Sequence, residues 1–204
     1  GKFDTLLMVQ AQLIVEGYHS IALSSNALGA LFGCYTLPDF LYSHAYTFEE
    51  KILRFNNGLY ELSLSEHPDV FVIGVPGGIF EFESVEYNHF SELPLIISKA
   101  IDIDIAILST YHFTELRKEG LQKMYEKCLY QYGAPVYAFS IGHTSFETDI
   151  YSIHYCYLDD EYIQKFQPDT SQIPFPVIID TKEEKSKRIV SGLIQTLASN
   201  LDAV

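Results

Sequence analysis

The sequence predicts a three-layer, doubly wound α/β domain in which a mostly parallel sheet carries helices on both faces, with all 204 residues in one domain. Short apolar segments alternate with longer helical patterns along most of the chain, and parallel strands need such helical crossovers. Hydrophobic residues make up 48% of the chain and charged residues 20%, which suits a core buried between two helical layers. This pattern is typical of P-loop NTPase-like or Rossmann-like folds.

The predicted helices begin and end at local sequence signals. Apolar residues recur at helical spacing near the start of the chain, and Gly17 ends that run. The segment NALGALFG predicts a helical turn closed by Gly33. Thr47 and Glu50 form a capping box that opens the next long helix. The helices are expected at residues 3–15, 48–64, 92–101, 114–131, 160–166 and 182–201.

The predicted strands are short and apolar, and all but one have the character of buried strands. The exception is the alternating segment DIYSIHYCYL at residues 149–158, which predicts a half-exposed antiparallel strand at one edge of the sheet. The buried strands are expected at residues 18–25, 69–75, 104–110, 134–141 and 175–180.

Composition and charge exclude several classes of partner. The formal net charge is −14, and a surface this acidic repels nucleic-acid phosphates and anionic lipids. No apolar run approaches the length of a membrane span, and the first residues lack a signal-peptide pattern. The three cysteines are widely spaced, so neither a disulfide framework nor a zinc site is expected. We therefore expect a cytoplasmic protein that binds neither nucleic acid nor membranes.

A candidate site lies where the predicted strands end. In doubly wound sheets, ligands bind outside the carboxyl ends of the strands, where loops and helix N-termini expose N–H groups. The residues at these ends are mostly small and polar, although turns also favour such residues. The candidate ligand- or phosphate-binding residues are Lys2, Thr5, Ser24, Ser25, Asn26, Pro76, Gly77, Gly78, Ser109, Thr110, His112, Gly142 and His143.

The glycines that follow the strand at 69–75 have two interpretations. Gly77 and Gly78 let the backbone pass close to a phosphate or a neighbouring loop, or they form a simple tight turn. His112 and His143 end two neighbouring strands, but scattered histidines give such pairs by chance, so no metal site is predicted.

The start of the chain resembles the end of a Walker A loop, because Gly1 and Lys2 open a predicted helix. Two requirements of that motif are not met. Phe3 stands where a hydroxyl should hold Mg²⁺, with Thr5 nearby, and Gly74 stands where the Walker B acid is expected. Phosphoryl transfer without metal ligands loses most of its electrostatic stabilisation. The sequence therefore favours a degenerate P-loop over an active NTPase.

Several segments together resemble a known family. They are Lys2-Phe3-Asp4, Leu31-Phe32-Gly33, IGVPGGI at 73–79 and ILSTY at 107–111. The chain is similar over most of its length to the C-terminal part of a bacterial peptide maturation system family. Its members are found beside radical SAM enzymes in bacteriocin-type gene clusters of clostridia and related Gram-positive bacteria. The resemblance implies a longer protein with a further N-terminal domain, but no catalytic residue can be transferred.

Three functions remain open from the sequence. The first is an accessory component of ribosomal peptide (RiPP) maturation that binds a precursor peptide, a partner radical SAM enzyme or a nucleotide. The second is a nucleotide-dependent (ATP or GTP) peptide-activating enzyme, with Lys2 on phosphate and Thr5 at the metal. The third is a homodimeric interaction module whose surface comprises strand 150–158 and the aromatic segment 80–90. Its anchors would be Phe80, Phe82, Tyr87 and Phe90.

Overall fold

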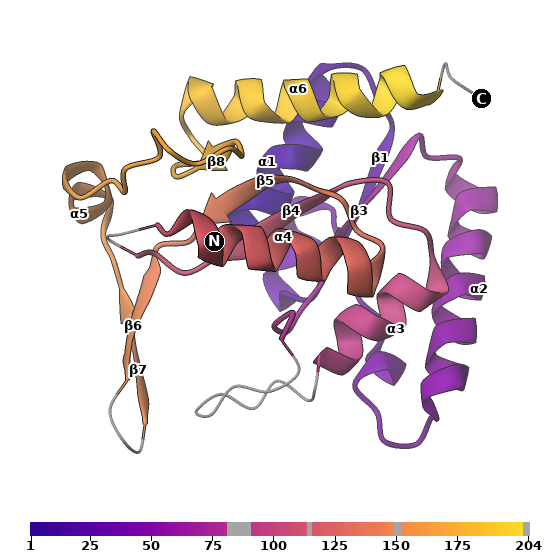
Figure 1. The fold of residues 1–204 in the computed structure, drawn as a ribbon. Helices are drawn as coiled ribbons and strands as arrows, with labels where there is room; N and C mark the ends of the chain where they lie inside the picture. Colours follow the sequence, from indigo (N-terminus) through magenta and orange to yellow (C-terminus); the bar gives the residue numbers. More distant parts are fainter. Residues whose placement is uncertain (81–90, 114–115, 149–151, 202–204) are drawn as a thin grey trace.

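The computed structural model describes residues 1–80, 91–113, 116–148 and 152–201 (Figure 1). In chain order its elements are α1 (Lys2–Val15), β1 (Ser20–Ser24), η1 (Ala27–Phe32), β2 (Tyr35–Thr36), η2 (Asp39–Leu41), α2 (Phe48–Glu66), β3 (Val70–Gly74), α3 (Glu92–Ala100), β4 (Ala106–Thr110), α4 (Lys118–Tyr132), β5 (Val136–Ile141), β6 (Thr144–Thr148), β7 (Ile153–Tyr157), α5 (Asp160–Lys165), β8 (Val177–Ile178) and α6 (Glu184–Leu201). The mostly parallel α/β class predicted from the sequence is confirmed. None of the described helices combines the length and apolar character that crossing a membrane requires.

The described strands form two parallel sheets and one antiparallel pair. Sheet A has the order β2-β1-β3, and sheet B has the order β4-β5-β8. In sheet A, β1 pairs with β3 in register from Ser20↔Val70 to Ser24↔Gly74. The antiparallel pair β6–β7 projects from the body of the molecule (Figure 1).

Successive side chains along the strands pack against helices on opposite faces of the sheets. Ile21 and Leu23 of β1 pack in a cluster with residues of α2 and α3. Ala22, which lies between them, packs against Leu6 of α1 instead. A period of two along a strand sends successive side chains to opposite faces. The helices α1 and α2 therefore cover opposite faces of sheet A.

Sheet B is covered in the same way, with one irregularity. Ala106 and Leu108 of β4 pack in a cluster with residues of α4, whereas Ile107 packs against residues of α1 and α6. The pairing of β4 with β5 shifts register between Ala106 and Ile107. That bulge allows both Val136 and Phe139 of β5 to reach the α4 face.

The structure corrects three predicted elements. The helix predicted at 114–131 begins at Lys118, because Arg117 is extended (φ −92°, ψ 123°). The strand predicted at 149–158 is not an edge of the parallel sheet: it contains β7, which pairs with β6, a strand not expected from the sequence. The strand predicted at 175–180 is reduced to the two residues of β8. Residues 81–90, which include most of the aromatic segment, lie outside the described residues.

Candidate functional site

The carboxyl ends of β1 and β3 meet at the first turn of α1. The ammonium group of Lys2 donates hydrogen bonds to Ser25 Oγ, just after β1, and to the Val75 carbonyl oxygen, just after β3, each at 3.1 Å. Lys2 therefore ties α1 to both of these strand ends.

The carboxyl ends of β4 and β5 reach the same place. The N–H of Gly142, just after β5, donates to the Thr110 carbonyl at the end of β4 (2.8 Å). A Cβ atom at Gly1 would lie 3.7 Å from the Gly142 Cα atom, so these two backbone segments are in contact. The strands β1, β3, β4 and β5 thus end at one common edge, which we call the α1 edge: Lys2, Thr5, Ser25, Val75, Thr110, Ser140 and Gly142.

The electrostatic environment of Lys2 is unusual for a lysine. Its side chain is half-buried, and burial lowers its pKa below the ordinary value. Both oxygens that accept its hydrogen bonds are neutral. Among the described carboxylates, none forms an ion pair with it. Since a partly desolvated charge is costly unless it is paired, this ammonium group would gain from an anionic partner.

The hydroxyl group of Thr5 is already engaged inside the protein. Thr5 is buried, and its Oγ1 lies 2.7 Å from Ser140 Oγ and 3.1 Å from the Gly1 carbonyl. The hydrogen bond to Ser140 joins α1 to β5. A metal ion at Thr5 would have to displace these partners.

The polar residues that follow β1 divide into two roles. Ser24 is buried, and its Oγ accepts from the Asn26 N–H at 3.0 Å. Asn26 Oδ1 accepts from the Leu28 N–H at 3.0 Å and so caps η1. Only Ser25, the Lys2 acceptor, faces the α1 edge in this group.

The glycines around β3 also differ in their roles. Gly77 has φ +85°, a conformation that favours glycine, and it forms the turn that follows Pro76. Gly74 is required for a different reason, because a Cβ atom there would lie 2.7 Å from Leu6 Cδ1 of α1. In the sequence, Gly74 is notable only because it replaces the Walker B acid. Its role is to let α1 pack closely against the end of β3.

His112 is buried, whereas Ser109 is a half-buried residue of β4. Ser109 is paired with Ser140 inside sheet B. His112 is only 3% exposed, and its Nε2 has no hydrogen-bond partner among the described residues. Burial lowers the pKa of His112, a hydrogen bond with the Phe166 backbone opposes this shift, and His143 lowers the pKa further.

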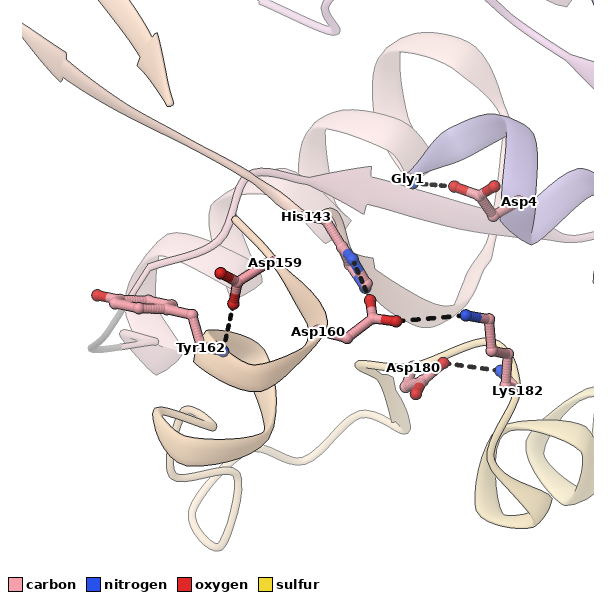
Figure 2. Close-up of polar contacts among 8 residues, drawn as sticks. All are labelled: Gly1, Asp4, His143, Asp159, Asp160, Tyr162, Asp180 and Lys182. Atoms are coloured by element: carbon pink, nitrogen blue, oxygen red, sulfur yellow. Dashed lines mark hydrogen bonds and ion pairs between the residues drawn. The ribbon is translucent and has the colours of Figure 1, made fainter. Parts of the chain in front are cut away.

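His143 belongs to a charged group beside the α1 edge, which Figure 2 shows. Its Nδ1 lies 3.4 Å from Asp160 Oδ1, and Asp160 Oδ2 lies 3.4 Å from the ammonium group of Lys182. Lys182 and Asp160 are well exposed, so the energy of this pair is small. His143 was predicted as a site residue from the sequence, but its partners Asp160 and Lys182 were not. The sequence features that could have indicated these partners are the acidic segment LDDEY and the lysine after the last strand.

A hollow of about 380 Å³ lies beside the α1 edge. Its lining is mostly apolar and includes Thr110, Phe113, Arg117, Leu121 and Met124. The hollow therefore adjoins the end of β4 and the start of α4.

Comparison of the chain with protein families, curated proteins and solved structures finds no match. The fold and the site thus define a mostly parallel α/β protein whose strand ends converge on a half-buried lysine that has no counterion among the described residues.

Proposed function

We propose that this chain is an accessory component of a ribosomal peptide maturation system, and that its degenerate P-loop-like edge binds a phosphate-bearing ligand, a nucleotide above all, without turning it over. The peptide maturation setting rests on the sequence resemblance. A precursor-peptide gene and a radical SAM gene next to the coding gene would support it. The binding of an anion rests on the α1 edge.

The environment of Lys2 is the main support for anion binding. Its side chain is half-buried, its described hydrogen-bond partners are neutral oxygens, and it stands at the N-terminus of a 14-residue helix. Helix N-termini favour anions through their free N–H groups and the helix dipole. A phosphate at the α1 edge would supply the negative charge that Lys2 lacks. The apolar hollow beside Thr110 could accept a flat apolar group such as a nucleobase.

Two observations favour binding without catalysis. Gly74 occupies the strand end where an acid would hold a metal-bound water, and Leu6 leaves no room for a side chain there. The Thr5 hydroxyl is committed to Ser140 and Gly1. The alternative, a nucleotide-dependent enzyme, needs both of these positions to change.

Thermal unfolding with and without nucleotide tests the proposal. ATP or GTP at millimolar concentration should raise the Tm, because a ligand at about 100 times its Kd adds roughly 2.7 kcal/mol to the free energy of unfolding. The Lys2→Met variant should lose this shift. The matched control is Lys182→Met, which removes an exposed lysine near the same edge and should retain the shift.

The outcomes separate the alternatives. No shift in the unchanged protein, or an equal shift in Lys2→Met, would contradict binding at the α1 edge. A shift that needs Mg²⁺ and is accompanied by phosphate release would favour the enzyme instead.

The homodimeric module has one observation in its favour. The β6–β7 hairpin projects from the body (Figure 1), and Tyr157 on it is 81% exposed. Exposed aromatic side chains are common anchors of protein interfaces. Light scattering after size exclusion would distinguish a dimer from a monomer.

A further inference from the structure

In the described part of the chain, the inner edges of the two parallel sheets are unpaired. Sheet A ends at β3 and sheet B ends at β4, and Figure 1 shows β4 between β5 and β3. Among the described residues, no backbone hydrogen bond joins β3 to β4. Each strand therefore turns a row of N–H and C=O groups toward the other without pairing. Such open edges are templates for another strand.

The two sheets nevertheless share one hydrophobic layer. A single cluster contains Leu13 of α1 and Val190 of α6, together with Val72 of β3, Ile107 of β4 and Ala138 of β5. The helices α1 and α6 therefore cover both sheets from one face. On the other face, α3 contacts α4, so the cover is continuous there as well.

The inner strands β3 and β4 are less buried than the strands beside them, which is the reverse of an ordinary parallel sheet. In a parallel sheet with helices on both faces, the central strands are the most buried. Here β1 is buried throughout and β5 is buried at all but one residue, whereas β3 and β4 are half-buried almost throughout. The half-buried residues include the large apolar side chains of Phe71, Ile73 and Leu108. Apolar side chains at the centre of the molecule thus lack part of their packing.

We propose that the interval between β3 and β4 accepts one further parallel β-strand, supplied by the polypeptide that leads into Gly1. The position of Gly1 identifies this occupant. Gly1 lies at the common carboxyl edge, against Gly142 after β5 and next to Lys2, which is bonded to the Val75 carbonyl after β3. A strand that runs parallel to β3 and β4 ends at this edge and needs only a short turn to reach Gly1. This inference does not depend on the proposed phosphate binding.

The geometry also specifies the character of the inserted strand. It needs about five residues to match β3 and β4, which have five each. Neighbouring strands lie about 4.8 Å apart, so one inserted strand separates β3 from β4 by about 9.6 Å. Because helices cover both faces, its side chains should be apolar on both sides, as in other buried parallel strands.

Hydrogen exchange on the native-length protein tests the occupant. The amides of β3 and β4 should exchange as slowly as those of β1 and β5. A stretch of about five residues shortly before Gly1 should be protected by a factor of about 100 or more relative to an unfolded peptide. Fast exchange of those preceding residues, or a native chain that has none, would overturn the proposal. Protection of β3 and β4 that appears only when a separate peptide is added would overturn it too.

Disulfide trapping in the same native-length protein tests the separation. In the variant Val72→Cys/Ile107→Cys the two cysteines lie on the same face of β3 and β4. No disulfide should form between them, because Cα atoms more than about 7 Å apart cannot be bridged. The matched control is Ile107→Cys/Ala138→Cys, which joins registered neighbours of β4 and β5 and should form a disulfide. Efficient formation of the first disulfide would show that β3 and β4 pair directly and would overturn the inserted strand.

Discussion

His112 combines a polar ring with nearly complete burial. Its backbone N–H donates to the Thr144 carbonyl at 2.8 Å, and its ring packs edge-on against Tyr162 with centroids 6.1 Å apart. Its Nε2 has no partner in the part of the chain that the structure describes, so little stabilises an imidazolium ion there. The lowered pKa of His112 follows mainly from this burial. The neutral ring therefore packs the loop after β4 against α5.

This burial predicts acid sensitivity. Between the lowered pKa of folded His112 and about 6.5, the unfolded chain binds more protons than the folded chain. The free energy of unfolding should therefore fall as the pH drops through this window, by at most about 1.4 kcal/mol per pH unit for one proton. Denaturation of His112→Gln across pH 5 to 7 should show a flatter profile than the unchanged protein. A variant of an exposed histidine, His44→Gln, serves as the control, and an unaltered slope in His112→Gln would contradict the prediction.

The strand ends and helix starts read from the sequence include most polar residues of the α1 edge, but they do not indicate the contacts of those residues. Lys2 and Ser25 were predicted together because both follow from strand ends and helix starts. Their shared partner, the Val75 carbonyl, is a backbone group that no residue pattern reveals. Asn26 is a small polar residue after β1, as Ser25 is, yet it caps η1. Side-chain type predicts where polar groups gather, whereas packing decides which of them face the site.

Among the elements, α2 and α3 are joined by a charged pair. Lys51 is 4% exposed, although it lies in the first turns of α2, and its Nζ donates to Glu92 Oε1 at 2.8 Å. Glu92 opens α3, where its carboxylate also suits the helix dipole. A pattern of charged residues at a helix start predicts exposure, so the sequence did not indicate this burial.

Removal of one charge from this pair should destabilise the protein. Glu92→Gln leaves the buried Lys51 ammonium group without a counterion and should lower the free energy of unfolding by about 1–3 kcal/mol. Adding Lys51→Met to that variant removes the stranded charge and should recover part of the loss. Urea denaturation measures both, with the exposed Glu61→Gln as a control on α2. Equal stability of the single and double variants would show that the charge of Lys51 is not the cause.

Element boundaries were predictable where the chain carries a complete local signal. The capping box of α2 forms as predicted, with Thr47 N–H donating to Glu50 Oε2 (2.8 Å) and Glu50 N–H donating to Thr47 Oγ1 (3.2 Å). The helix predicted from Thr114 begins four residues later, because Leu116 packs in the cluster around Ile141 and Ile163 instead of continuing a helix. Tertiary contacts of this kind leave no trace in a local pattern.

At the scale of the whole molecule, the question is whether the two sheets unfold as one unit. Their described strands are not paired with each other, but α1 and α6 pack on both sheets through the cluster that contains Leu13, Val72 and Ala138. The alternation of strands and helices predicted the α/β class, since parallel strands require helical crossover connections. The division into two sheets was not predictable from the sequence, because the apolar pattern of a strand does not show which strand lies beside it.

The shared core predicts a single cooperative unit. Leu13→Ala removes a side chain that is 2% exposed and should lower the free energy of unfolding by about 2–5 kcal/mol. Leu41→Ala is a matched variant whose equally buried side chain packs only in the cluster of sheet A. If the sheets unfold together, the slowest amides of both strands exchange through global unfolding. Within each variant, hydrogen exchange should then accelerate by the same factor in β1 and in β5. Faster exchange in β1 alone after Leu41→Ala would show instead that each sheet, with its own helices, is a separate folding unit.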